Sequence, residues 1–217
     1  RLLALSGAVV LILTLSACND SNPVDFEEEE QPLEVITVED LPADPATQVG
    51  EDGQPKGLDR FTFFSLRDGE IVLAHDAEDR ADSNSTAWDV AFQATNIIVN
   101  GGVSGPGHGA AYVAEAAFEE VTEVDVDRLQ ADDGENLAIP IGSGNGWYNY
   151  SGPPNHLITP IPGRTIVVRT ADGEAYAKIR ILSYYEGAPD DPAASDAKGR
   201  YYTFEYVLQT DGSPSFE

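Results

Sequence analysis

The histidines are the scarcest side chains here that can act as an acid, a base or a metal ligand near neutral pH. There are three of them, His75, His108 and His156. His75 ends a predicted strand beside Asp76 and is best explained as a surface residue. His108 lies in the glycine-rich segment 101–109, where glycines let the backbone bend and approach a ligand closely. That segment either presents His108 to a ligand or is a flexible loop with an exposed histidine.

His156 follows an aromatic loop and opens a Leu-Ile run. Trp147, Tyr148 and Tyr150 precede it within the segment 147–155. Aromatic rings beside an imidazole are typical of a surface that holds a flat apolar ring. The sequence therefore predicts a ligand groove of Trp147, Tyr148 and Tyr150 that ends in His156. A histidine hydrogen-bonded inside the turn is the other explanation.

Motifs for catalysis are missing from the sequence, which has no Gly-rich phosphate loop, no G-x-S-x-G elbow and no H-E-x-x-H pair. The acidic turns 125–127 and 132–135 offer oxygen ligands for Ca²⁺. They lack the EF-hand spacing, so solvated acidic turns explain them better. We therefore expect a protein that is not an enzyme and that has no metal site built from its own carboxylates.

The single cysteine, Cys18, closes an unbroken apolar run. Residues 2–16 form a mostly apolar stretch of about 15 residues, too short to span a hydrocarbon core that needs about 20. The segment 15–18, Leu-Ser-Ala-Cys, resembles the lipobox of bacterial lipoproteins, in which the leader is cut before a lipidated cysteine. We expect a signal peptide over 1–17 and attachment to a membrane through acyl chains on Cys18. An ordinary secretory leader is the other possibility.

The formal net charge of −26 comes from 38 acidic and 12 basic residues, with only three lysines. Such a field repels nucleic acid and anionic lipid surfaces, which argues against both as partners. High salt would shorten the Debye length to about 3 Å and make this charge tolerable. The scarcity of lysine therefore suggests a halophilic source.

Residues 18–57 are predicted to form an acidic, proline-rich tether. They include the block Glu27–Glu30, recurrent prolines and almost no aromatic residues. Such a segment cannot bury enough apolar surface to offset its ordering entropy, so we expect a disordered spacer between anchor and domain. Within it, residues 33–38 could instead dock as a lone strand.

From Leu58 onward the chain changes to short β-rich runs separated by Gly, Pro and Asp. The runs 61–66 and 71–74 flank an Asp-Gly turn, and so do the runs 165–170 and 174–184. Asp-Gly between apolar runs is a strong hairpin signal. We therefore expect two antiparallel hairpins.

The segment 200–209 alternates cleanly, which places Tyr202, Phe204, Tyr206 and Leu208 on one face. Further strands are expected over residues 88–94 and 97–100, a helix only over 113–121, and a hairpin-loop insertion over 187–199. Together these elements predict a single antiparallel all-β domain over residues 58–217.

Two of these segments carry a resemblance to a known family. Residues 88–92, Trp-Asp-Val-Ala-Phe, and 100–105, Asn-Gly-Gly-Val-Ser-Gly, resemble the WDxAF and NGGxSG signatures of HmuY-like lipoproteins. Further similar motifs follow in order at residues 147–150, 168–173, 176–179 and 202–206. The resemblance covers about residues 58–212 and includes the lipobox. It implies an all-β, hand-shaped domain on the outer surface of Bacteroidetes-type bacteria.

Founding members of that family are hemophores, in which two axial side chains hold haem iron and the haem passes to a TonB-dependent receptor. The resemblance implies haem as the cofactor, iron or haem acquisition as the function, and a TonB-dependent outer-membrane receptor as the partner. His156 is the candidate for one axial ligand and His108 for the second. The alternative is an HmuY-like binding or adhesion module for a glycan, small molecule or receptor, without haem ligation.

Other residues of these motifs have simpler roles. Trp88, Val90 and Phe92 alternate along one strand and are better explained as core than as site, and Asp89 is expected to cap or brace a neighbouring turn. The propionates of a haem would meet a very negative surface, and nearby arginines would have to offset that charge. The arginines near the predicted cleft strands are Arg164, Arg169 and Arg180.

Overall fold

Strands dominate the computed structural model, which describes residues 33–51, 53 and 55–217. They are β1 (Val35–Pro42), β2 (Gln48–Val49), β3 (Pro55–Lys56), β4 (Thr62–Ser65), β5 (Glu70–Leu73), β6 (Val90–Gln93), β7 (Asn96–Val99), β8 (Ala110–Ala114), β9 (Tyr148–Tyr150), β10 (Ile158–Pro160), β11 (Thr165–Arg169), β12 (Tyr176–Tyr185) and β13 (Gly199–Gln209). Short 3-10 helices are η1 (Ala81–Asn84), η2 (Phe118–Glu120) and η3 (Val126–Arg128). The predicted signal peptide, Cys18 and the tether up to residue 32 lie outside the described residues. Within the described part, no helix is long and apolar enough to cross a membrane.

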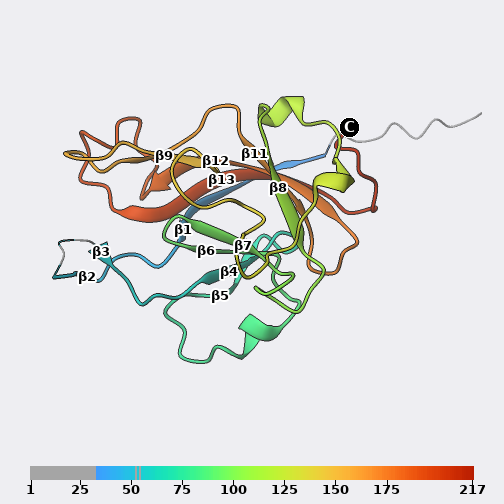
Figure 1. Ribbon diagram of the computed structural model, residues 1–217, viewed down its shortest axis with the longest axis horizontal. Coiled ribbons are helices and arrows are strands. Elements are labelled where there is room, and N and C mark those ends of the chain that lie inside the picture. Colours follow the sequence, from blue (N-terminus) through green and yellow to red (C-terminus); the bar gives the residue numbers. More distant parts are fainter. Residues whose placement is uncertain (1–32, 52, 54) are drawn as a thin grey trace, which may run out of the picture. The chain divides into compact units, whose positions relative to one another are not determined.

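Two antiparallel sheets form the framework (Figure 1). The larger has the order β1-β13-β12-β11-β8 and the smaller has the order β5-β4-β6-β7. Pairs β9–β10 and β2–β3 stand outside them. Both hairpins predicted from Asp-Gly turns are present, since β4 pairs with β5 and β11 pairs with β12. The prediction of an antiparallel all-β domain is confirmed.

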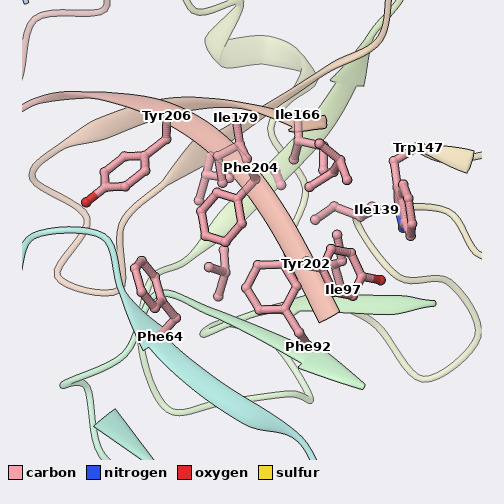
Figure 2. Close-up of a cluster of buried hydrophobic side chains, with 14 of the residues drawn as sticks. Phe64, Phe92, Ile97, Ile139, Trp147, Ile166, Ile179, Tyr202, Phe204 and Tyr206 are labelled. Atoms are coloured by element: carbon pink, nitrogen blue, oxygen red, sulfur yellow. The ribbon is translucent and has the colours of Figure 1, made fainter. Parts of the chain in front are cut away.

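The main core lies between the inner faces of the two sheets. Phe64, Phe92, Tyr202, Phe204 and Tyr206 are all buried in one cluster, with Phe92 stacked on Phe204 at a centroid distance of 5.4 Å. Figure 2 shows these rings together with Trp147 in the same cluster. The predicted core face of residues 200–209 is therefore confirmed, because every second side chain of this segment enters the core.

The outer face of each sheet is covered as well. On the larger sheet Val167 and Val207 pack with Phe118 and Phe216, and on the smaller sheet Phe63 packs edge-on against Trp88 at a centroid distance of 4.7 Å. Burial on both faces explains why these strands are near-continuous apolar runs. It also corrects one expectation, because Trp88 precedes β6 and lies in the outer cluster, not on the face of Phe92.

Strand β1 corrects the predicted tether of residues 18–57. Val35–Pro42 pairs antiparallel with β13 at the edge of the larger sheet. Ile36 and Val38 pack against the main core, and Leu41 is buried, whereas Glu34 and Glu39 are exposed. An edge strand needs only one apolar face, so the acidic residues point to solvent and do not oppose folding. The docking strand considered for residues 33–38 is the observed arrangement.

Two remaining segments differ in how well they were predicted. The helix expected over 113–121 is absent: the segment holds the end of β8 and the 3-10 helix η2. Val113 pairs with Ile166 of β11, and that sheet contact overrides the helical propensity of the alanines. The loop expected over 187–199 does connect β12 to β13.

Candidate functional site

His156 lies in the turn that joins β9 to β10. Tyr150 pairs with Ile158 across this hairpin, and the His156 N–H donates to Gly152 O at 2.9 Å. The backbone of His156 has φ +53°, a left-handed conformation that few non-glycine residues adopt. Its Nδ1 is hydrogen-bonded to the phenol of Tyr150, and the two ring centroids are 5.8 Å apart. Both side chains are exposed at one end of the described domain.

A cavity of about 530 Å³ opens beside this pair. It is bounded by the β9–β10 hairpin, the β6–β7 turn, the end of β12 and the start of β13. Its lining residues are Pro45, Ala46, Pro55, Ala94, Thr95, Tyr150, His156, Ile158, Tyr184, Tyr185, Lys198, Gly199 and Arg200. Its size and its aromatic and apolar walls are those of a small-molecule site.

The charged side chains that line the cavity are basic, and each is paired with a carboxylate beside it. Among the described residues that line it none is acidic, whereas Lys198 and Arg200 are basic. Arg200 is held in place, because its guanidinium donates to the carbonyls of Asp44 at 2.9 Å and Pro55 at 2.8 Å. Lys198 is exposed and pairs with Glu186 at 3.2 Å. Arg200 also pairs with the buried carboxylate of Asp44 at 3.6 Å, so each cation of the cavity is matched by a carboxylate just outside its lining.

Tyr184 and Tyr185 form a wall of the cavity next to the β9–β10 hairpin. Burial raises the pKa of Tyr184 far above its ordinary value, so this phenol stays neutral. The phenol of Tyr185 accepts a hydrogen bond from the N–H of Ile158 at 2.9 Å. That bond ties the β9–β10 hairpin to the end of β12 and gives the cavity a fixed wall.

His108 lies at the other end of the larger sheet. Its N–H donates to Ala171 O at 2.7 Å, and its carbonyl accepts from Arg169 Nε at 2.9 Å, both beside the β11–β12 turn. His156 lies near Tyr185, at the far end of the ten-residue strand β12. At about 3.3 Å per residue, the two ends are on the order of 30 Å apart.

Two axial imidazoles must approach within about 4 Å of each other, because each Fe–N bond is roughly 2 Å long. The expectation that His156 and His108 share one iron is therefore wrong. The glycine segment that carries His108 folds back onto β7 and the β11–β12 turn, which binds it to the end of the domain away from the cavity.

Trp147 and Tyr148 correct the predicted groove. They are only 3% and 8% exposed, and both belong to the main core. The indole Nε1 of Trp147 donates to Thr95 O at 3.0 Å, so its polar atom is satisfied inside the protein. Of the three aromatic residues predicted to form the groove, only Tyr150 reaches the cavity. The β9 segment turns Trp147 inward, where it contacts Tyr202.

The WDxAF and NGGxSG motifs have structural roles. Asp89 is buried and accepts backbone hydrogen bonds from Leu66 and Ala171, both at 2.8 Å, which confirms that it braces turns. Burial raises the pKa of Asp89, although the same two hydrogen bonds oppose the rise. Gly101 packs so closely that a Cβ there would lie 2.0 Å from Gly109 O. These glycines are needed for close packing of the backbone.

The arginines expected to offset the propionate charge lie elsewhere. Arg164 and Arg180 line a different hollow, where Arg164 pairs with Glu115 at 3.0 Å and Arg180 pairs with Glu205 at 2.6 Å. Arg169 is engaged by the carbonyl of His108.

In the acidic turn 132–135, the first carboxylate is used inside the protein. Asp132 is buried and accepts from the N–H groups of Val99 at 3.0 Å and Ala138 at 2.8 Å. In the part of the chain that is described, no group of three or more His, Cys, Asp or Glu residues could hold a metal ion.

Among the cavity residues that sequence reasoning missed are the aromatic and basic side chains of Tyr184, Tyr185, Lys198 and Arg200. Two weak signals pointed to them. Tyr184-Tyr185 ends a predicted strand with two adjacent aromatic residues, and Lys198 is one of only three lysines, in a loop next to a strand. Neither signal tells which other segments lie beside these residues.

Residues 58–206 match the family model described as HmuY protein, and the chain belongs to this HmuY family. Proteins of the family are surface-associated binding proteins rather than enzymes. A crystal structure of an apo HmuY analog from Tannerella forsythia is similar, with a TM-score of 0.41 and 16% identity over 82% of this chain and 95% of that chain. No curated protein matches the chain.

Proposed function

We propose that this protein is a non-catalytic surface lipoprotein that binds haem or a related tetrapyrrole in the cavity beside His156, for iron or haem acquisition. The observation that carries the proposal is the cavity itself. It combines aromatic and apolar walls, an imidazole and a phenol at its rim, and two basic side chains, Lys198 and Arg200. A flat apolar ring with anionic arms matches each of these features.

The residues of the cavity fit haem in one respect and not in another. An imidazole or a phenol at its rim is a known kind of axial ligand for haem iron. Lys198 and Arg200 would face the propionates. Ligation by two histidines does not fit, because His108 is at the far end of β12 and His75 is half-buried beside Thr62. We therefore propose axial ligation from one side, by the Tyr150–His156 pair.

The test is a titration of the purified chain with ferric haem, followed in the Soret band. We expect His156→Ala to weaken binding at least about tenfold, which corresponds to about 1.4 kcal/mol. His108→Ala is the matched control, because it removes the same side chain from another exposed loop, and we expect it to bind haem like the wild type. A spectrum that stays that of free haem would reject the proposal, and equal losses in the two variants would reject this cavity as the site.

A second candidate function is a binding or adhesion module for another ligand, such as a glycan, a small molecule or a receptor. The observation that favours it is the single pair of ligating side chains, where two converging histidines were expected. Burial of Trp147 and Tyr148 leaves little aromatic surface for a sugar, so a small anionic aromatic compound fits this version better. Binding of metal-free protoporphyrin that is unchanged by His156→Ala, together with no change in the haem spectrum, would favour it.

Anchoring and delivery are part of the same proposal. Lipidation of Cys18 would hold the protein on the outer membrane at the cell surface, and a TonB-dependent receptor would take the ligand from it. Expression of wild type and Cys18→Ser with a radiolabelled fatty acid tests the anchor. We expect label and membrane association only with Cys18. Equal labelling of both proteins would reject this lipidation site.

A further inference from the structure

The turn between β6 and β7 borders the cavity on one side and a second hollow on the other. The second hollow has a volume of about 450 Å³, and it shares Pro55, Ala94 and Arg200 with the lining of the cavity. Thr95 lines the cavity, whereas Asn96 lines the second hollow. A ligand that extends from one space into the other would therefore pass along this turn.

Buried residues hold the backbone of the turn in place. Ala94 donates its N–H to Ala43 O at 2.8 Å, and its carbonyl accepts from the Tyr202 phenol at 2.8 Å. The carbonyl of Thr95 accepts from the indole of Trp147 at 3.0 Å. Ala43, Tyr202 and Trp147 are each 3% exposed or less. The turn is thus fixed to the core before any ligand arrives, which lowers the entropy cost of binding.

Ala94 adopts a conformation that this rigid surrounding imposes. Its φ is +48°, and two-residue hairpin turns usually place Gly, Asn or Asp where φ is positive. A non-glycine residue in this region costs free energy and persists where its surroundings determine the conformation. The direction in which the two following side chains leave the turn is fixed as a result.

Those two side chains offer unused hydrogen-bonding groups to the two spaces. Thr95 and Asn96 are both half-buried. Among the described residues, no hydrogen bond uses the Thr95 hydroxyl or the Asn96 carboxamide. A hydroxyl has one donor and a carboxamide has two, so the turn can donate to a polar group in either space.

The charges of the second hollow allow an anionic group to approach. Asp44 and Asp59 line it, and the basic side chains of Lys56 and Arg200 line it too. The Asp44 carboxylate already accepts two backbone N–H groups at 2.7 and 3.0 Å, and Asp59 accepts from Gln93 Nε2 at 2.7 Å. Two negative groups are thus matched by two positive ones, on a chain whose net charge is −26. A carboxylate meets less repulsion here than over the chain as a whole.

We infer that the β6–β7 turn is the element that recognises the carboxylate arms of the ligand. The flat ring lies in the cavity, Thr95 Oγ1 donates to one carboxylate, and Asn96 Nδ2 donates to the other in the second hollow. Neutral donors suit this role, because a hydrogen bond to a charged acceptor is stronger than one between neutral groups. This inference rests on the proposed haem-type function and names the residues that select a tetrapyrrole dicarboxylate.

The test is a fluorescence titration of the full chain with metal-free protoporphyrin and with its dimethyl ester. Thr95→Val and Asn96→Leu remove the hydrogen-bonding groups at similar side-chain size. We expect each variant to bind protoporphyrin at least about fivefold more weakly than the wild type. The ester carries no charge, so the loss for the ester should be about twofold or less. Asn149→Leu is the matched control, because Asn149 is exposed on β9 and lines neither space, and we expect wild-type binding.

The outcomes separate this inference from the proposed function. Wild-type binding of protoporphyrin by Thr95→Val and Asn96→Leu would overturn the inference, and so would equal losses for the acid and the ester. A loss in Asn149→Leu as large as that in Asn96→Leu would overturn it as well. The melting temperature of each variant checks that it is folded, and Asn96→Ala replaces Asn96→Leu if the leucine variant is not. A wild-type chain that binds neither porphyrin would reject the proposed function itself.

Discussion

Replacement of Asp89 tests how the two sheets are held together. The carboxylate accepts from Leu66 N, in the turn after β4, and from Ala171 N, in the turn after β11, both at 2.8 Å, and the residue is 6% exposed. A hydrogen bond to a charged group contributes about 1.5–3 kcal/mol. Asp89→Ala removes both bonds and also relieves a buried charge. We therefore expect the free energy of unfolding to fall by about 3–5 kcal/mol.

Asp89→Asn separates the hydrogen bonds from the charge. Its amide oxygen keeps one acceptor, but its NH₂ group faces the second backbone donor, so we expect a loss of about 2 kcal/mol. Asp76→Asn is the matched control, because it removes the same unit charge from an exposed position and should change stability by less than about 0.5 kcal/mol. Denaturant unfolding at one salt concentration measures all three variants. If Asp89→Ala were as stable as the control, the bracing role would be wrong.

The pH dependence of the free energy of unfolding of wild type and Asp89→Asn gives a second check. Burial raises the pKa of Asp89 in the folded state above the unfolded value of about 3.9. Between these two pKa values the folded state binds more protons, so the contribution of Asp89 is full below about pH 4 and declines as pH rises through the folded pKa. Asp89→Asn cannot titrate. The stability gap between wild type and Asp89→Asn should therefore narrow from pH 4 to pH 7, and a widening gap would contradict the shift.

Four further predictions concern the surface charge, the core and the glycine segment. The melting temperature should rise between about 0.1 M and 1 M salt, because the Debye length falls from about 10 Å to 3 Å and screens the charge of −26; equal melting at both salts would argue against a halophilic protein. Trp147→Ala should lower the free energy of unfolding by about 3–5 kcal/mol, since Trp147 is only 3% exposed. A loss below about 1 kcal/mol in a denaturant titration would contradict the burial of its ring. Gly101→Ala should cost about 1–3 kcal/mol in the same assay, because its Cβ would clash with Gly109 O; an unchanged midpoint would mean the loop moves freely. Burial raises the pKa of Tyr184 and Tyr202, so ultraviolet titration should find that they ionise only as the protein unfolds in alkali; ionisation in the folded state would contradict their burial.

Features determined by nearby residues were predictable from sequence. The two Asp-Gly hairpins depend on turn chemistry within a few residues, and the core face of residues 200–209 depends on a simple alternation. Asp89 was also placed correctly as a brace. In the hairpins and the alternating strand the physical cause lies within one element or its immediate neighbours, whereas the two partners of Asp89, Leu66 and Ala171, are distant in the sequence.

Features determined by distant partners were not predictable. For the segment of β1 the sequence left both a tether and a docked strand open. Pairing with β13, from the other end of the chain, decides for the strand. Trp147 lies in a segment whose aromatic composition is typical of a binding loop. Its contacts with Thr95 and Tyr202 nevertheless hold its ring inside the core. His108 and His156 are equally plausible ligands in sequence. Which end of β12 each one occupies follows only from the packing of whole sheets.

The first strand of the sheet begins at Val35, which limits the distance between the folded domain of a lipidated protein and its membrane. About 17 residues separate Cys18 from Val35, and a fully stretched chain of that length covers about 60 Å at most. A fold that began only at Leu58 would allow about 140 Å. If Cys18 is lipidated as proposed, this shorter connection would hold the folded domain within about 60 Å of the membrane. A receptor in the same membrane could then reach the proposed cavity while β1 stays paired with β13.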